Sequence, residues 1–328
     1  GWIVVMGATC LLIYREPPRD EEAESRRSLG EVFSGMVEVV GNLRFFLLVT
    51  GLLVTLVMGS KWWSFGRVAA VAGTWLARNL VLDAVLKSAG RDDQAPWWAQ
   101  PMRVGEGRYL IFLLLMAGFW TSFNQIFMTL PEYIRDYVDT RDLLAALQAV
   151  AGAVGVDMTT WSRALLENGQ IKPEYLINLN AGAIILFQVL ISYFVRKKTP
   201  LASIISGVTV TVISFLVYTV APSGWVVVTA ILVFSVGEML ASPRSKEYAG
   251  RIAPPEKVGM YMGYFYWCVA LGNLFGGLLS GVMYQGFGPH GMDRPDLMWM
   301  IFAALAAGTA IALVAYNRWA VTTSPGPR

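Results

Sequence analysis

The residue most able to do chemistry in this sequence is a single carboxylate inside a long apolar run. Glu238 lies within residues 225–242, and a helix of that length can cross a bilayer core, for which roughly 17–25 residues are needed. An acid at the centre of a spanning helix costs roughly 2.5–3.5 kcal/mol on insertion scales. Such acids therefore usually face a bundle interior or an aqueous cavity and take part in transport. The position of Glu238 predicts a residue on a transport pathway.

The chemistry available to this carboxylate is proton exchange coupled to ion pairing. A carboxyl group releases its proton more readily when an ammonium or guanidinium group approaches, and takes the proton back when the partner leaves. Glu238 is therefore the predicted proton-coupling residue. The alternative is a purely structural Glu, whose hydrogen bonds to a neighbouring helix are its whole role.

Polar side chains recur at helical spacing in two other apolar segments. Residues 108–130 and 176–195 each carry one polar stripe, made of Thr121, Asn124, Gln125 and Thr129 in the first and of Asn180, Gln188 and Ser192 in the second. Such amides could simply link helices, at about 0.6 kcal/mol per hydrogen bond. Several stripes together favour a central, water-accessible cavity instead.

The composition predicts an all-α, polytopic membrane protein. Hydrophobic residues make up 55% of the 328 residues and charged residues 15%, with a mean hydropathy of +0.51. Continuous apolar runs, without alternation of period two, exclude a transmembrane β-barrel. Basic residues are scattered through loops and form no stripe, so nucleic-acid binding is not expected.

Enzyme and cofactor chemistry have no support in the sequence. The single histidine, His290, lies in a loop, and there is no zinc-protease motif and no Gly-x-Ser-Gly nucleophile turn. We expect no enzymatic activity, no metal site and no cofactor. Cys10 and Cys268 both lie in apolar segments and do not indicate a disulfide framework.

Six spanning segments are predicted from Arg108 onward. They cover residues 108–130, 176–195, 201–221, 225–243, 258–284 and 297–316. The basic residues of their loops gather on one side, which the positive-inside rule makes cytoplasmic in a cell-membrane protein. On the other side lies the acidic loop 131–175, in which Leu143–Val154 is predicted to form a short surface helix.

The region before Arg108 is predicted to be more heterogeneous. We expect residues 1–14 to end a spanning helix whose start, with an N-terminal half, precedes this sequence. Residues 15–42 are a charged cytoplasmic linker, and 43–107 an inserted helical hairpin with its linker. Within it, residues 68–86 form either the second helix of that hairpin, which we favour, or an amphipathic helix at the membrane interface. The bundle is expected to fill 108–318, and 319–328 to form a cytoplasmic tail.

The segment 258–284 combines glycines with aromatic residues. Its small-xxx-small pairs predict close approach to neighbouring helices, and they are Gly259/Gly263, Gly272/Gly276 and Gly277/Gly281. Smooth ridges of this kind also let helices rock against one another during alternating access.

These residues resemble the C-terminal half of the proton-dependent oligopeptide transporter (POT) family, a branch of the major facilitator superfamily. The matching elements, in order and spacing, are Gly237-Glu238, Ser242-Pro243, Glu247-Tyr248, Ala253-Pro254-Pro255, Met262-Gly263 and Ala270-Leu271-Gly272-Asn273. Phe123-Asn124-Gln125 resembles the family's seventh helix and Leu179-Asn180 the start of its eighth. The resemblance covers roughly residues 108–318, and it makes the hairpin similar to the extra helix pair of bacterial members.

The resemblance implies a proton-coupled symporter that binds di- or tripeptides between two six-helix halves. Its partners would then be the peptide, protons, the lipid bilayer and the N-terminal half. Glu238 would pair with the substrate's amino group and Asn180 would approach the peptide. The remaining candidate substrate contacts are Asn124, Gln125, Phe265 and Trp267.

Two positions depart from the family pattern. Asn124 stands where the family usually has Glu, and an amide cannot exchange a proton. Phe265 stands where the family usually has Trp. These departures favour, as an alternative, a major facilitator transporter for another metabolite or drug. An alternative of another class is a membrane scaffold or receptor that does not transport.

Overall fold

The computed structural model describes residues 63–88, 107–157, 165–255 and 258–322, with residues 51, 52, 55 and 59. It divides into two units, Gly1–Arg103 and Val104–Arg328, which are described separately below. The predictions for residues 1–14 and 15–42, for most of the first hairpin helix and for the end of the tail lie outside the described residues.

The first unit contains one long described helix, α4, from Phe65 to Ser88. It includes the whole of the predicted segment 68–86. Arg78 is exposed on it, and the Asn79 amide donates to the carbonyl of Trp75 at 2.9 Å. α4 is not among the described helices that are long and apolar enough to cross a membrane. The inserted hairpin therefore stays a prediction.

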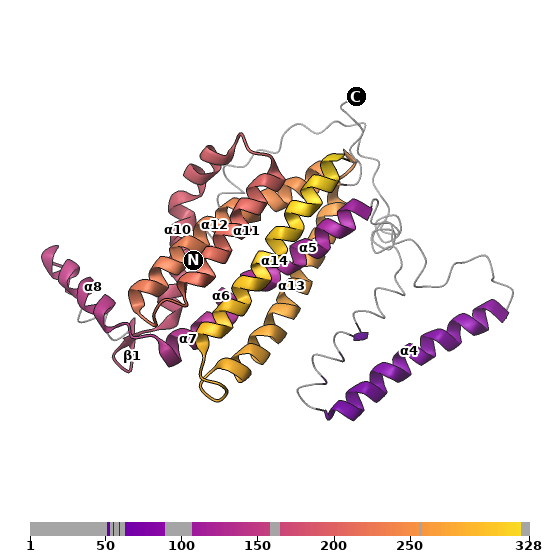
Figure 1. Ribbon diagram of the computed structural model, residues 1–328, viewed down its shortest axis with the longest axis horizontal. Helices are drawn as coiled ribbons and strands as arrows, with labels where there is room; N and C mark the ends of the chain where they lie inside the picture. The colour runs from indigo at the N-terminus through magenta and orange to yellow at the C-terminus, as the bar shows by residue number, and fades with distance from the viewer. Residues whose placement is uncertain are drawn as a thin grey trace, which may run out of the picture. The chain divides into compact units, whose positions relative to one another are not determined.

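The second unit confirms the predicted all-α membrane bundle, with six spans in the described chain (Figure 1). The first span runs from Arg108 to Tyr137 and consists of α5 (Gly107–Phe123), α6 (Gln125–Met128) and α7 (Leu130–Tyr137). The other spans are α10 (Pro173–Val195), α11 (Pro200–Val217), α12 (Gly224–Ile252), α13 (Val258–Phe287) and α14 (Pro295–Thr322). The loop between the first two spans holds α8 (Arg141–Ala153), β1 (Leu166–Glu167) and β2 (Gln170–Ile171).

Two spans extend beyond the expected boundary, and each contains a proline near that boundary. The first span continues to Tyr137 as a broken helix, because Pro131 lies at the start of α7 and has no N–H for the preceding turn. α12 continues through Pro243 to Ile252 instead of ending at residue 243. Pro243 cannot donate to the carbonyl of Met239, which accepts from the side chain of Gln188 at 3.4 Å instead.

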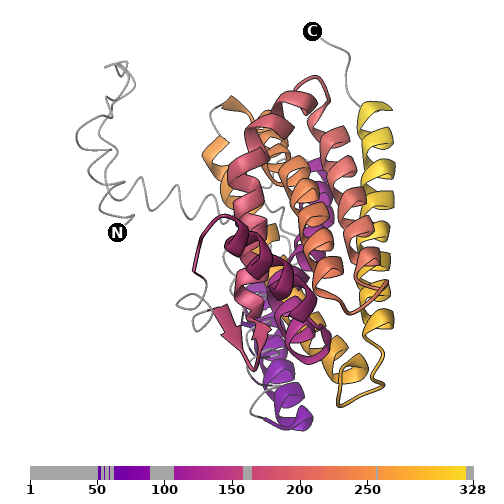
Figure 2. The ribbon, with the colours of Figure 1, turned by 90° about the vertical axis from the view of Figure 1, so that its left-hand side faces the viewer.

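The six spans lie side by side in a bundle (Figure 2), and their contacts divide them into two inverted triplets. α5 packs against α13 and α14, and α12 packs correspondingly against α10 and α11, while α11 packs against α14. The first triplet is α5, α10 and α11, and the second is α12, α13 and α14. When the helices are matched in this order, each of these contacts in one triplet has its counterpart in the other. Internal repeats of this kind are characteristic of secondary transporters, whose sites form near the bilayer midplane.

The helices α11 and α12 approach each other backbone to backbone. A Cβ placed on Gly207 would lie 2.5 Å from the carbonyl oxygen of Gly237, so only glycine allows this approach. Polar side chains of α11 donate to carbonyls of α12 on either side of the contact, Ser203 to Leu240 at 2.9 Å and Ser214 to Ala230 at 2.8 Å. Small interface residues replace the hydrophobic effect as the basis of helix association in lipid.

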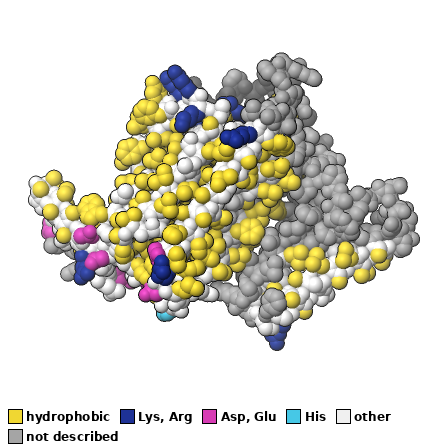
Figure 3. Space-filling model, in the orientation of Figure 1, with side chains coloured by type: hydrophobic (Ala, Val, Ile, Leu, Met, Phe, Trp, Pro, Cys, Tyr) yellow, Lys and Arg dark blue, Asp and Glu magenta, His cyan; other side chains and the backbone are white. Residues whose placement is uncertain are grey.

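Charged residues separate to the two ends of the bundle (Figure 3). The basic end carries Arg196, Lys197, Lys198, Arg244, Lys246, Arg251 and Arg318. The acidic end carries Glu132, Asp136, Asp139, Asp142, Glu174, Asp293 and Asp296. With apolar helices between the ends, the protein is a multi-pass protein of the cell membrane.

Tyrosine hydroxyls connect four helices at the basic end. The hydroxyl groups of Tyr248 on α12 and Tyr316 on α14 lie 3.1 Å apart, and Tyr316 donates to the carbonyl of Arg108, at the start of α5, at 3.1 Å. Close by, Tyr109 donates to the carbonyl of Tyr261 on α13 at 2.5 Å.

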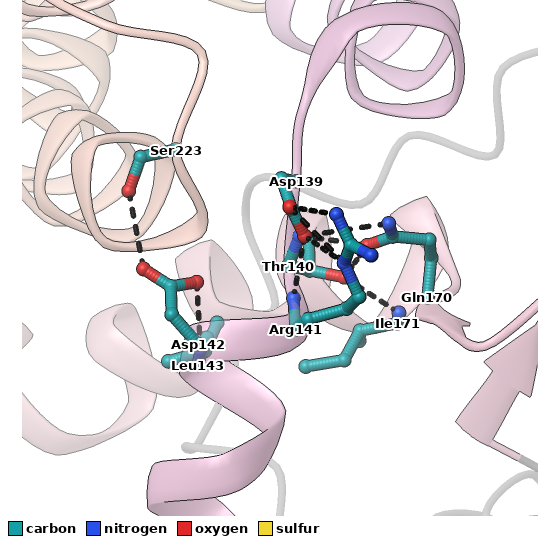
Figure 4. Close-up of polar contacts among 8 residues, drawn as sticks. All are labelled: Asp139, Thr140, Arg141, Asp142, Leu143, Gln170, Ile171 and Ser223. Atoms are coloured by element: carbon teal, nitrogen blue, oxygen red, sulfur yellow. Dashed lines mark hydrogen bonds and ion pairs between the residues drawn. The ribbon is translucent and has the colours of Figure 1, made fainter.

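The acidic end is fastened by a cluster that we call the latch, formed by Asp139, Thr140, Gln170 and Ser223 (Figure 4). The Gln170 amide oxygen accepts from the backbone N–H of Thr140 at 2.7 Å and from its hydroxyl at 2.6 Å. The backbone of Asp139 forms a parallel bridge with Ser223, just before α12. Arg141 binds the Asp139 carboxylate and holds its pKa well below its usual range. The latch therefore joins the start of α8, the β-hairpin and the start of α12.

The α11–α12 contact predicts a destabilised variant. Gly207→Ala should lower the free energy of unfolding by roughly 1–3 kcal/mol, because the added methyl group meets backbone atoms that cannot move aside. The measurement is the thermal unfolding midpoint in detergent. The matched control is Gly308→Ala on α14, where a Cβ meets nothing within 4 Å. An equal midpoint for both variants would contradict the tight crossing.

Candidate functional site

Glu238 is held by α10 in what we call the acidic joint. The Asn180 amide nitrogen on α10 lies 3.0 Å from the Glu238 Oε2 and 3.2 Å from the Ser235 hydroxyl, both on α12. Asn180 is buried and Glu238 is half-buried. Among the described residues, Glu238 forms no ion pair. Within the described part of the chain, the joint thus presents a carboxylate with one amide donor and no counter-charge.

The orientation of Glu238 follows from its neighbour in the sequence. Gly237 must face α11, because a Cβ there would lie 2.8 Å from both the Gly207 carbonyl and the Thr211 hydroxyl. Successive residues of an α-helix point about 100° apart. Glu238 is therefore turned away from α11 and toward α10.

A second polar cluster, the neutral joint, connects the first span with α13. The Asn124 amide nitrogen donates to Asn273 Oδ1 at 2.6 Å and to the Trp120 carbonyl at 2.8 Å. The fully buried Gln125 donates to the Gly276 carbonyl at 3.1 Å and accepts from the Thr129 hydroxyl at 2.6 Å. The Thr129 hydroxyl in turn accepts from the Ser280 hydroxyl, whose oxygen lies 2.8 Å away. The stripe expected to line a cavity therefore lies mostly within this helix contact.

The two joints occupy corresponding places in the inverted triplets. One connects the first helix of the second triplet, α12, to the second helix of the first triplet, α10. The other connects α5 and α6 to α13 in the corresponding way. At one of these two places the repeat has a carboxylate with an amide, Glu238 with Asn180. At the corresponding place it has two amides, Asn124 with Asn273.

The remaining predicted contact residues fall in different environments. Phe265 is fully buried in the hydrophobic core, and Trp267 is half-buried on α13. Asn273 is exposed and was not singled out from the sequence as a site residue. The signal for it was present: it is a lone amide in an otherwise apolar and glycine-rich stretch of a span.

The six glycines of α13 that the sequence predicted to pack closely divide into three kinds. Gly272 and Gly276 lie where α13 crosses the first span, since added Cβ atoms would come within 2.2 Å of Trp120 and 3.1 Å of Asn124. Gly277 reaches only ordinary contact, 3.7 Å from the Met128 sulfur. At Gly259, Gly263 and Gly281 a Cβ would meet nothing within 4 Å among the described residues. Of the three glycine pairs, Gly272/Gly276 is therefore the one at which the described residues pack closely.

The site's chemistry is that of a carboxylate and several amides. The carboxylate can hold a proton or pair with a cation, and the amides can donate and accept hydrogen bonds but do not titrate. Within the described residues, no three His, Cys, Asp or Glu side chains are grouped so that they could hold a metal ion.

The chain is similar to known membrane transporters. It is 26% identical over 161 residues to the uncharacterized MFS-type transporter YqjV of Bacillus subtilis (strain 168), and 22% identical over 188 residues to the uncharacterized MFS-type transporter YttB of the same organism. These matches cover 49% and 56% of this chain, and 38% and 40% of the relatives. No family model matches the chain.

Solved structures of POT family transporters share its fold. The transporter PepTSo matches 99% of this chain with 20% identity and a TM-score of 0.51. A POT family transporter in complex with 5-aminolevulinic acid matches 97% with 15% identity and a TM-score of 0.52. This chain covers 59% and 60% of those two structures. The resemblance found in the sequence is confirmed at the level of the fold.

The neutral joint predicts that Gln125 contributes to stability. Gln125→Met keeps the volume but removes the bond to the Gly276 carbonyl, so the free energy of unfolding should fall by roughly 0.6–1.7 kcal/mol, the range of interhelical hydrogen bonds in membranes. Thermal unfolding in detergent measures this. Gln285→Met, at an exposed position of α13, should leave the midpoint unchanged. Equal midpoints for the two variants would remove Gln125 from the joint.

Proposed function

We propose that this chain, whose fold is that of the POT transporters within the major facilitator superfamily, belongs to a secondary active transporter. We further propose that it moves small peptides or peptide-like solutes together with protons by alternating access. The observation that supports this most is the acidic joint. A half-buried carboxylate in the middle of a span, held by one amide and facing no described cation, is suited to bind a proton and a substrate ammonium in turn.

The proposed substrate contacts follow from the two joints. Glu238 would pair with the amino group of the solute, and Asn180 would orient the carboxylate through its 3.0 Å bond. Asn124 would offer a polar, uncharged surface on the opposite triplet. Gln125 and Phe265 would support the site from within the packed bundle, because both are fully buried. Trp267 remains a candidate contact on α13.

The complete site would need residues beyond the described bundle. The solved POT structures extend past the part that this chain matches, and transporters of this fold bind substrates between internal repeats near the midplane. We propose a second six-helix half as the partner. Residues 1–14 would end its last helix, 15–42 would be the linker, and the hairpin within 43–107 would precede this bundle.

The neutral joint favours a second candidate, a major facilitator transporter for another metabolite or drug. Asn124 is engaged with Asn273 and cannot exchange a proton, so proton coupling would depend on Glu238 alone within the described spans. A solute with a cationic group but no peptide bond would satisfy Glu238 equally well.

Replacing the carboxylate tests the transport mechanism. In the protein with its flanking residues, reconstituted in vesicles, Glu238→Gln should abolish accumulation driven by a pH gradient, since Gln cannot take up or release a proton. Exchange of substrate across the membrane without a gradient should remain. Glu167→Gln, in the exposed hairpin turn, is the matched control. Undiminished gradient-driven uptake by Glu238→Gln would exclude the proposed coupling.

A competition experiment separates the two substrate classes. Uptake of a radiolabelled dipeptide should occur in wild type, and unlabelled di- and tripeptides should compete for it because they present the same ammonium and amide groups. Sugars and neutral drugs should not compete. The second candidate would be favoured if dipeptide uptake were absent while a cationic metabolite accumulated.

A further inference from the structure

The helix α8 has an unusual surface for a segment outside the six spans. From Leu143 to Val156 there is no charged residue, and Gln148 is the only polar side chain. Several of its apolar side chains are exposed, with Leu147 at 45%, Val150 at 64% and Val154 at 69%. Exposed apolar surface that is contiguous in this way indicates contact with a partner or a membrane.

The exposure extends around most of the helix in its middle turn. Residues 147–150 are four consecutive exposed positions, and at about 100° per residue they cover nearly every direction around the axis. Only Leu143 and Ala151 are buried in α8. Figure 1 shows α8 extending away from the six long helices. A single protein surface would cover one side of such a helix, whereas lipid can surround most of it.

The latch fixes α8 at a definite depth. The helix begins directly after Thr140, and the chain returns to the same residue where the backbone N–H of Ile171 donates to the Thr140 hydroxyl at 2.8 Å. This is the acidic end, where the spans leave the hydrocarbon. A helix of 13 residues is about 20 Å long, less than the ~30 Å of a bilayer core. Because the chain is also held at this same side after the helix, by the contact of Ile171 with Thr140, α8 cannot span the membrane.

We propose that α8 lies in the interfacial region of the leaflet at the acidic end, with its apolar side chains in the boundary between headgroups and acyl chains. The charged residues at its start, Arg141 and Asp142, stay at headgroup depth. Because residues 143–156 carry no basic side chain, the binding depends on apolar burial and needs no anionic lipid. α8 thereby contacts lipid at the membrane surface, beside the lipid that the six spans contact in the bilayer core.

Site-directed quenching tests this placement in the full chain. Single cysteines at Leu147 and Val150, in a Cys10→Ser, Cys268→Ser background, are labelled with bimane and reconstituted in neutral phosphatidylcholine vesicles. Quenching is measured with lipids carrying a nitroxide near the headgroup or near the bilayer centre, and with aqueous iodide. Ile311→Cys, 70% exposed in the middle of α14, is the deep lipid control, and Glu167→Cys is the aqueous control.

The expected result is loss of fluorescence at positions 147 and 150 with the shallow nitroxide, and less loss with the deep one. Position 311 should show the opposite order, and position 167 should respond only to iodide. If positions 147 and 150 respond to iodide as position 167 does, α8 lies in water and the proposal is overturned. If neither lipid nitroxide nor iodide quenches them, a protein surface covers α8, which also overturns it.

Discussion

The contact between the backbones of Gly207 and Gly237 is the constraint on which the rest of the bundle depends. Two helices in lipid gain little from the hydrophobic effect, so their association needs close packing. Glycine at both positions allows α11 and α12 to meet backbone to backbone. This contact fixes the rotation of α12, and the next residue, Glu238, is consequently directed to α10. A catalogue of polar residues would not reveal this dependence, because the glycines carry no functional group.

The two polar joints show how an inverted repeat can hold different chemistry at equivalent places. Both joints use an asparagine to connect the first helix of one triplet to the second helix of the other. One partner is the carboxylate of Glu238 and the other is the amide of Asn124. Among the four residues that form these two contacts, Glu238 is therefore the only one that can titrate. Under the proposed function, this asymmetry would give a bound solute a defined orientation, since its cationic group would have one favourable position.

The sequence predicted the spans better than it predicted which polar residues meet. Long apolar runs report membrane helices directly, so the six spans and the central place of Glu238 were foreseeable. The partner of each polar side chain depends on the helix rotation, which is set by contacts far apart in the sequence, such as that of Asn124 with Asn273. Periodicity placed Gln125 and Thr129 on one polar face but could not show that α13 covers it. The helix end expected at Pro243 was wrong because a side chain from α10, Gln188, satisfies the carbonyl that proline leaves free.

Pro243 also divides α12 mechanically into two arms. The arm before it is braced by α10 and α11, and the arm after it is tied through Tyr248 to α14 and, by way of Tyr316, to α5. Between them the backbone ladder lacks one bond, and the substitute from Gln188 is long at 3.4 Å. We therefore expect α12 to bend most easily at Pro243, which would let its two arms change their mutual angle without moving Glu238 relative to Asn180.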